Sequence, residues 1–392
     1  MENNKNPNIR FKGFTDPWEQ RKLGDVVQIT MGQSPDGSTY SDEPSDYILV
    51  QGNADLQNGW VCPRIWTTQI TKKADAGDLI MSVRAPAGAM GKTAYNAVIG
   101  RGVAAIKGNE FIYQLLVKMD ADGFWKTLSC GSTFESLNSD NIKNAEVKIP
   151  TTAEQIKIGD YFQQFDNFIT LHQRKYNKLL NVKKSMLEKM FPKNGSNIPE
   201  IRFKGFTDPW EQRKFGDIVD KYEDPVETPH NGYYRLGIRS HAKGTFHSFV
   251  EKGHELETAK MHRVAANNFI VNITFGWEHA VAITDENDDG KLVSHRFPQY
   301  SFHEGMVPQF FKYVIADEDF RHWLWLASPG GAGRNRVLKL DEMLNYEVIF
   351  PSKAEQLKIG NYFKNLDNLI TLHQRKYNKL LNVKKSMLEK MF

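Results

Sequence analysis

The chain has 392 residues, with 51 lysines and arginines against 47 aspartates and glutamates, so its formal net charge is +4. This length predicts two or three domains, and a hydrophobic fraction of 40% is enough to form real cores. The mild positive charge permits nucleic-acid binding without requiring it. The two cysteines lack a metal-like spacing, and no apolar run is long enough for a membrane span or a secretion signal. We therefore expect a protein of a reducing compartment, the cytoplasm.

The N-terminal residues 1–22 hold most of a short repeat. Residues 8–27 return as residues 200–219 with three changes. Phe11, Phe14 and Trp18 are expected to anchor this segment on a neighbouring surface, and the Asp-Pro pair between them is a turn signal.

The first insert, about residues 23–150, predicts a mixed α/β domain. Short runs of strand-forming residues alternate with clusters of Gly, Pro, Asn and Asp, as in strands joined by turns. The predicted strands are 47–50, 78–83, 103–106 and 145–149, the predicted helix is 110–128, and a polar loop begins at Gly131.

A long helix is predicted after the first insert. Apolar residues recur from Ile158 to Met190 at alternating steps of four and three, and only His172 and Lys183 interrupt the stripe. This pattern places the stripe on one helix face. Residues 153–191 return as residues 354–392 with only six differences, and the last 23 residues of the two copies are identical. Each copy would form a rod of roughly 58 Å.

The two long helices are predicted to pair in antiparallel fashion. Their similar apolar stripes need partners, and each is the obvious partner of the other. The first helix leads from the first insert to the second, so under a pseudo-twofold axis the second helix must lead back. Phe392 should then lie near the first short repeat. We expect the seam residues His172, His373, Lys183 and Lys384 to tune register or pack at the seam's edge. Residues 174–189 carry six cations and one acidic residue, which fits either a solvated face or a basic docking surface.

The second insert, about residues 215–351, follows a linker at 192–199 and has a similar order of elements. Strands are predicted at 269–273 and 281–284, a helix at 307–326, and a loop at 330–336. Residues 131–150 and 332–351 align without a gap. The inserts therefore share a predicted fold but differ in surface chemistry, which suits recognition better than duplicated catalysis.

The predicted fold class is α+β. Two similar mixed α/β domains are joined by two long antiparallel helices with pseudo-twofold symmetry. The predicted domains are 1–150, the spacer helix 151–195, 196–351 and the C-terminal spacer helix 352–392.

Catalytic and metal motifs are incomplete throughout the chain. Residues 85–93 end like a phosphate-binding loop, but Pro86 stands where its first glycine belongs. Residues 285–290 start like a calcium loop, but Arg296 stands where its bidentate glutamate belongs. The histidines of the second insert have no tight metal spacing, and no adenine methyltransferase motif occurs. We therefore expect no catalytic residue, metal or cofactor. A coiled-coil scaffold that binds only proteins and a cryptic enzyme are the alternatives.

Polar residues in glycine-rich loops are compatible with reading DNA. Arginine pairs with guanine and Asn or Gln with adenine in the major groove, while lysines such as Lys92 and Lys243 suit phosphates. Ordinary loop polarity explains any single one equally well. The candidate DNA-binding residues are Gln33, Ser34, Arg84, Lys92, Arg101, Ser132, Thr133, Arg239, Ser240, His241, Lys243, Trp277, Arg334, Asn335 and Arg336.

The whole chain resembles the specificity (S) subunits of type I restriction-modification systems. The resemblance rests on the helices that begin AEQIKIGDYF and AEQLKIGNYF, on the two WEQRK segments, and on the dissimilar inserts. ITMGQSPDGSTY and AGDLIMSVRAPAG in the first insert are similar to signatures of that family. The second insert departs from the family, because it lacks the Gly-x-Ser-Pro signature.

The resemblance implies a sequence-specific DNA-binding subunit. Each insert would be a target recognition domain that reads one half of a split, asymmetric site, and the helices would fix the gap, about one helical turn or roughly 34 Å. The implied partners are two modification subunits, which use S-adenosylmethionine to methylate adenine N6, and ATP- and Mg-dependent restriction subunits that translocate and cleave DNA. A flipped target adenine would enter the methyltransferase. This chain would bind no cofactor, and would work on DNA in the bacterial cytoplasm. In this context the lysine-rich helix face is better interpreted as a docking surface for modification subunits or DNA.

Overall fold

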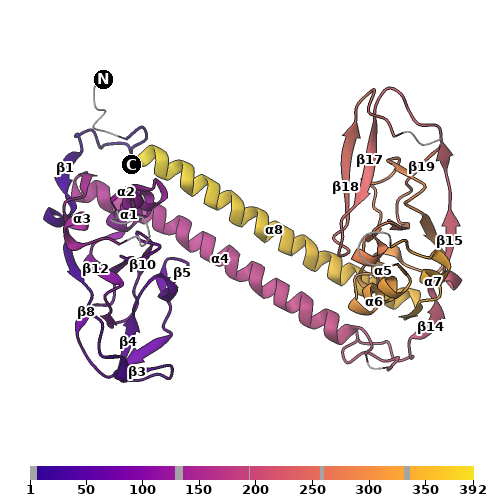
Figure 1. Cartoon of the computed structure of the whole chain (residues 1–392), viewed down its shortest axis with the longest axis horizontal. Helices are drawn as coiled ribbons and strands as arrows, with labels where there is room; N and C mark the ends of the chain where they lie inside the picture. Colours follow the sequence, from indigo (N-terminus) through magenta and orange to yellow (C-terminus); the bar gives the residue numbers. More distant parts are fainter. Residues whose placement is uncertain (1–6, 129–135, 194, 257–259, 331–335) are drawn as a thin grey trace. The chain divides into compact units, whose positions relative to one another are not determined.

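The computed structural model describes residues 7–128, 136–193, 195–256, 260–330 and 336–392. Contacts divide the chain into two units (Figure 1). Unit 1 comprises residues 1–175 and 373–392, and unit 2 comprises residues 176–372. Each unit therefore takes residues from both long helices, α4 (Thr152–Met190) and α8 (Lys353–Met391).

Unit 1 contains two sheets and a two-stranded ribbon. The larger sheet has the order β2-β12-β9-β10-β6-β5, the smaller one has the order β3-β7-β4-β11-β8, and β1 pairs with β13. The strands are β1 (Glu19–Lys22), β2 (Gln28–Met31), β3 (Tyr40–Ser41), β4 (Tyr47–Val50), β5 (Leu56–Gln57), β6 (Trp60–Val61), β7 (Ile65–Thr67), β8 (Lys72–Ala74), β9 (Leu79–Ser82), β10 (Met90–Lys92), β11 (Ala97–Ile99), β12 (Val103–Lys107) and β13 (Glu146–Ile149), and the short helices are α1 (Glu110–Ala121), α2 (Phe124–Leu128) and α3 (Ser139–Lys143).

Unit 2 repeats this arrangement with longer strands in its second sheet. The sheets have the orders β15-β23-β20-β21 and β16-β19-β22-β17-β18, and β14 pairs with β24. The elements are β14 (Glu211–Lys214), β15 (Val219–Tyr222), β16 (Pro225–Val226), β17 (Tyr233–Ile238), β18 (Thr245–Val250), β19 (Met261–Arg263), β20 (Phe269–Val271), β21 (Val281–Ile283), β22 (Leu292–Ser294), β23 (Gln299–Phe302), α5 (Pro308–Val314), α6 (Glu318–Leu326), α7 (Leu340–Leu344) and β24 (Glu347–Phe350).

The shared framework of the two inserts is visible in their strand pairing. In unit 1, β4 runs parallel to β11, and in unit 2, β17 runs parallel to β22. In both units the segment after the last insert loop forms a backbone hydrogen bond to a residue just past a central strand, which is β9 in unit 1 and β20 in unit 2. Leu137 N donates to Val83 O at 2.9 Å, and Leu338 N donates to Ile273 O at 2.9 Å. Similar register with different loop sequences confirms the predicted shared fold.

The predicted insert helices each divide into two. The chain turns at Gly123, which has a φ of +77°, and this turn separates α1 from α2. In unit 2, the Asp317 side chain accepts a hydrogen bond from Asp319 N and caps the start of α6. Both pieces carry buried apolar residues, so the apolar pattern continues across the turn and does not mark it.

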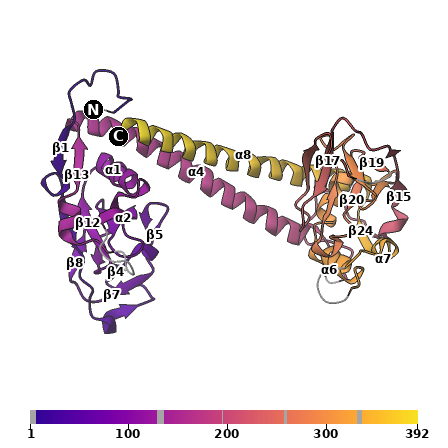
Figure 2. The same cartoon turned by 45° about the horizontal axis from the view of Figure 1, so that its top comes forward.

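The long helices pair in antiparallel fashion within each unit (Figures 1 and 2). In unit 1, Lys384 Nζ lies 2.6 Å from Asp166 Oδ1, and His172 Nδ1 lies 2.8 Å from His373 Nδ1. In unit 2, Lys183 Nζ lies 2.6 Å from Asp367 Oδ1. A later residue of α4 therefore meets an earlier residue of α8, as predicted. The two seam lysines form ion pairs across the helix pair.

Identical helix ends fill equivalent sites in the two units. In unit 1, the ring of Phe392 stacks on Phe111 at 5.1 Å and meets Trp18 edge-on at 6.1 Å. In unit 2, Phe191 stacks on Phe310 at 5.5 Å and meets Trp210 edge-on at 5.8 Å. Ile9 N also donates to Lys390 O at 2.9 Å. The chain end therefore lies beside the first short repeat, as expected.

The short repeats are fixed to the long helices by buried ion pairs. Arg10 forms a bidentate pair with Glu154 in unit 1, and Arg202 forms the same pair with Glu355 in unit 2. Each glutamate side chain is 1% exposed and each arginine side chain 12% exposed. Both carboxylates lie in the first turn of their helices, where the helix dipole favours negative charge. Across the described ranges, no helix has the length and hydrophobicity of a membrane span.

Candidate nucleic-acid interface

Unit 1 gathers several predicted residues at one edge of its larger sheet. The strands β2 and β9 end at the edge where β12, antiparallel to both, begins. Gln33 and Ser34 follow β2, Arg84 follows β9, and Arg101 precedes β12. Because these strands are neighbours in the sheet, residues far apart in sequence lie at one edge.

Hydrogen bonds hold these loops together. Ser34 Oγ accepts from Arg101 N at 3.2 Å, and Gln33 N donates to Ile99 O at 2.9 Å. This second bond joins the edge to the smaller sheet, where β4 and β11 also end and where Gln51 follows β4. We define loop cluster 1 as Gln33, Ser34, Gln51, Arg84 and Arg101; the side chains of Gln33, Arg84 and Arg101 are exposed.

Gln51 is not among the candidate residues predicted from the sequence, although it directly follows the predicted strand 47–50. The signal that could have found it is its place between Val50, which is buried, and Gly52. Ser132 and Thr133 lie outside the described residues. The chain re-enters loop cluster 1 just after them, because Ser136 forms an isolated β-bridge with Arg84.

Lys92 is not part of this surface. Its ammonium lies 2.9 Å from Glu110 Oε2, 5.0 Å from the Trp60 ring centre and 4.5 Å from the Tyr113 ring centre. The residue is only 9% exposed. The expected phosphate contact therefore does not fit its position, because the charge is buried and paired inside the unit. Burial raises the pKa of the Tyr113 hydroxyl, as do the nearby Asp166 and Glu110 carboxylates.

Unit 2 forms a corresponding group of loops. His241 N donates to Glu278 O at 2.9 Å, which joins the β17–β18 turn to the loop after β20. Ile273 N donates to Arg296 O at 3.0 Å, and Arg296 Nη1 donates to Thr274 Oγ1 at 3.0 Å, which joins the loop after β22. We define loop cluster 2 as Arg239, Ser240, His241, Lys243, Trp277 and Arg296.

Arg296 is a second residue that the sequence analysis missed as a DNA candidate. It is exposed, and it stands beside the central strand in the position that Gly102 occupies in unit 1, where Val83 N donates to Gly102 O at 2.9 Å. The polar run Ser-His-Arg at residues 294–296 is the only local signal. The long-range strand pairing that places it could not be read from the sequence.

The predicted residues of loop cluster 2 differ from one another in the groups that they can offer to a ligand. Lys243 is exposed and forms no ion pair with the residues that the structure describes. Ser240 Oγ donates to Glu278 Oε2 at 2.7 Å. Trp277 uses its Nε1–H on Thr274 O at 3.2 Å, so only its ring remains for a ligand. His241 is exposed in the turn, at a φ of +62°.

His279 has a structural role beside this cluster. It is 3% exposed, and its Nε2 lies 2.6 Å from Ile315 O. Burial lowers the pKa of the imidazole, so the neutral ring with a proton on Nε2 fits this site. Arg334 and Asn335 lie outside the described residues. Arg336 is half-buried, and its guanidinium lies 4.8 Å from the ring centre of the exposed Trp325.

The chemistry of these two clusters is that of binding. Among the residues with described positions, no group of three or more His, Cys, Asp or Glu side chains could hold a metal ion. The exposed side chains of the two clusters carry guanidinium, ammonium, amide and imidazole groups, which can donate hydrogen bonds to base edges and phosphates.

Comparisons with known proteins find similarity to one family. A family model described as the type I restriction modification DNA specificity domain matches residues 15–181. A protein of Methanocaldococcus jannaschii described as a type I restriction enzyme MjaX specificity subunit is 28% identical over 180 residues, which cover 43% of this chain and 41% of that protein. The type I restriction enzyme MjaVIII specificity subunit of the same organism is 23% identical over 298 residues, which cover 70% of this chain and 67% of that protein.

The fold extends this likeness to the whole chain. The crystal structure of a type I restriction-modification system S subunit from M. genitalium has a TM-score of 0.66 and 12% sequence identity, and the match covers 99% of both chains. The matched sequence spans less than half of the first relative's length, although the fold match spans nearly all of this chain. With its duplicated helices and two diverged inserts, the chain is similar to type I restriction-modification specificity subunits in part of its sequence and in its fold.

Proposed function

We propose that this chain reads a bipartite, asymmetric DNA site, with one half bound by each unit. The observation that carries the proposal is the pair of loop clusters. One framework, in which β9 and β10 pair in the same register as β20 and β21, presents different side chains at the same edge in each unit. A duplicated enzyme would keep the same reactive groups at both edges, whereas two readers of different sequences need different ones.

The chemistry of the clusters supports different half-sites. Loop cluster 1 exposes Gln33, Arg84 and Arg101, which can pair with adenine and guanine edges through two hydrogen bonds each. Loop cluster 2 exposes Arg239, Lys243 and Arg296, which supply more positive charge for phosphates and guanine.

The long helices are suited to a second role, the spacing of the half-sites and the docking of two modification subunits. Phe168 and Leu171 on α4 are 53% and 44% exposed, and their repeat equivalents Leu369 and Leu372 on α8 are each 43% exposed. Apolar side chains in matching positions of both units offer two similar protein-binding patches. Exposed lysines beside them, such as Lys175 and Lys376, can contact an acidic partner or DNA.

The division of labour follows from this assignment. The modification subunits would supply S-adenosylmethionine and adenine methylation, and the restriction subunits would supply ATP- and Mg-dependent translocation and cleavage. This chain would supply specificity alone, with no cofactor of its own. Such a role requires that it work beside the chromosome, in the bacterial cytoplasm.

DNA binding at several salt concentrations tests the proposal against a scaffold that binds only proteins. The chain with its modification subunit should bind a duplex that carries its site, and the affinity should fall steeply as salt rises, because phosphate contacts release counterions. Mapping of methylated adenines in a host with both proteins should then give the site. Salt-independent binding, or no DNA binding by the complex, would support the protein scaffold.

A further inference from the structure

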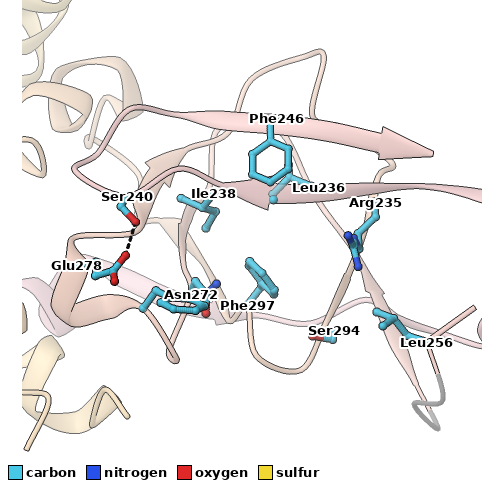
Figure 3. Close-up of a pocket in the computed structure, with 12 residues that line it drawn as sticks. Arg235, Leu236, Ile238, Ser240, Phe246, Leu256, Asn272, Glu278, Ser294 and Phe297 are labelled. Atoms are coloured by element: carbon cyan, nitrogen blue, oxygen red, sulfur yellow. Dashed lines mark hydrogen bonds between the residues drawn. The ribbon is translucent and has the colours of Figure 1, made fainter. Parts of the chain in front are cut away.

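Unit 2 contains a cavity of about 480 Å³ at the edge where loop cluster 2 gathers (Figure 3). One side comes from the β17–β18 ribbon, and the facing side comes from Ser294 and Phe297 at the end of β22. The loop after β20 contributes Asn272, Phe275 and Glu278. The cavity therefore lies where the sheet that contains β17, β18 and β22 meets the loop after β20, at the same edge as the proposed DNA-reading residues.

Aromatic rings form much of the cavity wall. Figure 3 shows Phe246 on one side of the cavity and Phe297 on the other. Phe246 is 40% exposed and Phe275 is 45% exposed, so neither side chain is buried in a hydrophobic core. Gly237 faces Phe246 across the ribbon, and a Cβ at Gly237 would come within 2.3 Å of the ring. The glycine thus lets the phenyl ring lie across the strand. Open aromatic faces in a cavity favour a planar heteroaromatic guest.

Polar groups stand at both ends of the cavity. The Ser240 and Glu278 pair, with its 2.7 Å hydrogen bond, lies at one end, and Arg235 lies toward the other (Figure 3). Asn272 accepts from Thr274 N at 3.0 Å through Oδ1, which leaves its Nδ2 without a partner among the residues described. The Arg235 guanidinium likewise has no hydrogen bond or ion pair within that part of the chain. Free donors beside flat apolar walls match the ring nitrogens and carbonyl oxygens of a nucleobase.

Cations surround the cavity. The Arg239 guanidinium lies 5.3 Å from the centre of the Phe246 ring. Lys243 is exposed in the same β17–β18 turn, and Arg296 follows the wall residue Ser294 by two positions. A guest that carries a phosphate on either side of its sugar would therefore meet positive charge outside the cavity and aromatic rings inside it.

We propose that this cavity holds one nucleobase that has left the stack of the half-site bound by unit 2. The inference rests on the proposed function and adds a specific site to it. A cavity of this size is in the range that small ligands occupy and accommodates a base with its sugar. Stacking on Phe246 and Phe297, with hydrogen bonds from Arg235 and Asn272, would replace the contacts that the base loses in the duplex.

Fluorescence of 2-aminopurine tests the proposal with a matched pair of variants. The analogue replaces each base of the unit 2 half-site in turn, and the duplex is bound by the chain in complex with its modification subunit. The wild type should show increased fluorescence at one position because the base has left the stack. The change Phe246→Ala should abolish that increase and weaken binding about tenfold, since one base loses its aromatic stacking partner. The control Phe249→Ala removes an exposed ring from the same strand, and Phe249 does not line the cavity. This change should alter neither the fluorescence increase nor the affinity for DNA.

The outcomes separate this inference from the proposed function. If the wild type binds its site normally but no position responds differently to Phe246→Ala and Phe249→Ala, the cavity proposal is wrong and the DNA-reading function stands. If the wild-type complex does not bind duplex DNA, both are wrong. Arg235→Gln gives an independent reading, because it keeps the cavity walls and should alter base preference at the unstacked position alone. Free deoxynucleoside monophosphates that bind as tightly as the duplex would assign the cavity to a soluble nucleotide and overturn the proposal.

Discussion

The side chains of loop cluster 1 are the smallest parts of the molecule on which specificity can be tested. Arg84 is exposed directly after β9 and adjoins the segment that resumes at Ser136. If it contacts a base, Arg84→Ala should cost about 1–3 kcal/mol of binding free energy and relax the preference at one base pair. Binding to a panel of duplexes with single substitutions in the half-site measures both effects.

Lys107→Ala is the matched control for that change. Lys107 lies at the other end of β12 from Arg101, and its exposed pair with Asp75 at 2.6 Å contributes little to stability. Lys107→Ala removes one positive charge from unit 1, as Arg84→Ala does. Equal losses for Arg84→Ala and Lys107→Ala, spread evenly over all sequences, would mean that only net charge matters.

Residue-level prediction from the sequence succeeded where local order decided the position and failed where distant residues did. Gln33, Arg84 and Arg101 are exposed in loops, as their Gly-rich surroundings indicated. Lys92 follows a glycine in the same manner, but Glu110 and two aromatic rings enclose it. Those partners come from other elements, so no local pattern could reveal them.

The ion pairs between the long helices make their register testable at the scale of one element. The Lys384 side chain is 13% exposed and its partner Asp166 is 28% exposed. Lys384→Ala should lower the free energy of unfolding by about 1–3 kcal/mol, because it leaves a partly buried carboxylate with one hydrogen-bond partner fewer. Urea denaturation measures the change, and Lys385→Ala, at the exposed neighbouring lysine, should have almost no effect. Equal losses of stability in the two variants would contradict a role of the Lys384–Asp166 ion pair in the register of the long helices.

The histidine pair predicts a pH dependence of helix pairing. Burial lowers the pKa of both His172 and His373, and the positive charges of Lys175 and Lys376 lower both further; the facing ring of His373 also lowers that of His172. The unfolded chain, with an ordinary pKa of about 6.5, binds protons first as pH falls. Stability should therefore fall as pH decreases through about 6.5 and continue to fall until the folded pair is protonated.

Thermal unfolding between about pH 8 and pH 5 tests this expectation. The wild type should lose more stability over this range than His172→Gln, which cannot take up the proton and keeps a polar side chain at the seam. If stability falls equally with pH in the two proteins, the histidine pair does not contribute to the pH dependence.

At the scale of the whole molecule, the helices are expected to set the distance between the half-sites. Adding one heptad of seven residues to both α4 and α8 keeps the apolar stripes in phase. It lengthens each helix by about 10 Å. The spacer in the methylated motif should grow by about three base pairs while both half-sites stay the same. An unchanged spacer would contradict the spacing role.

Much of the architecture could be predicted because the sequence contains two copies of the same segments. The copies at 153–191 and 354–392 gave both the helices and their pairing, and the fixed order of elements gave the shared fold of the inserts. The interface could be predicted only in outline. Arg296 and the cavity beside it depend on which strands become neighbours. The bond from Ile273 N to Arg296 O joins residues 23 positions apart, and the pairing of Arg235 in β17 with Leu292 in β22 joins residues 57 positions apart.

Exchange of one insert tests whether each unit reads its own half of the DNA site. Residues 23–150 are replaced by the corresponding insert of a type I specificity subunit to which the chain is similar, and methylated adenines are mapped across the genome of a host that also carries the modification subunit. We expect one half of the methylated motif to change while the other half and the spacer remain. A change in both halves, or in neither, would contradict the claim that each unit reads its own half of the site.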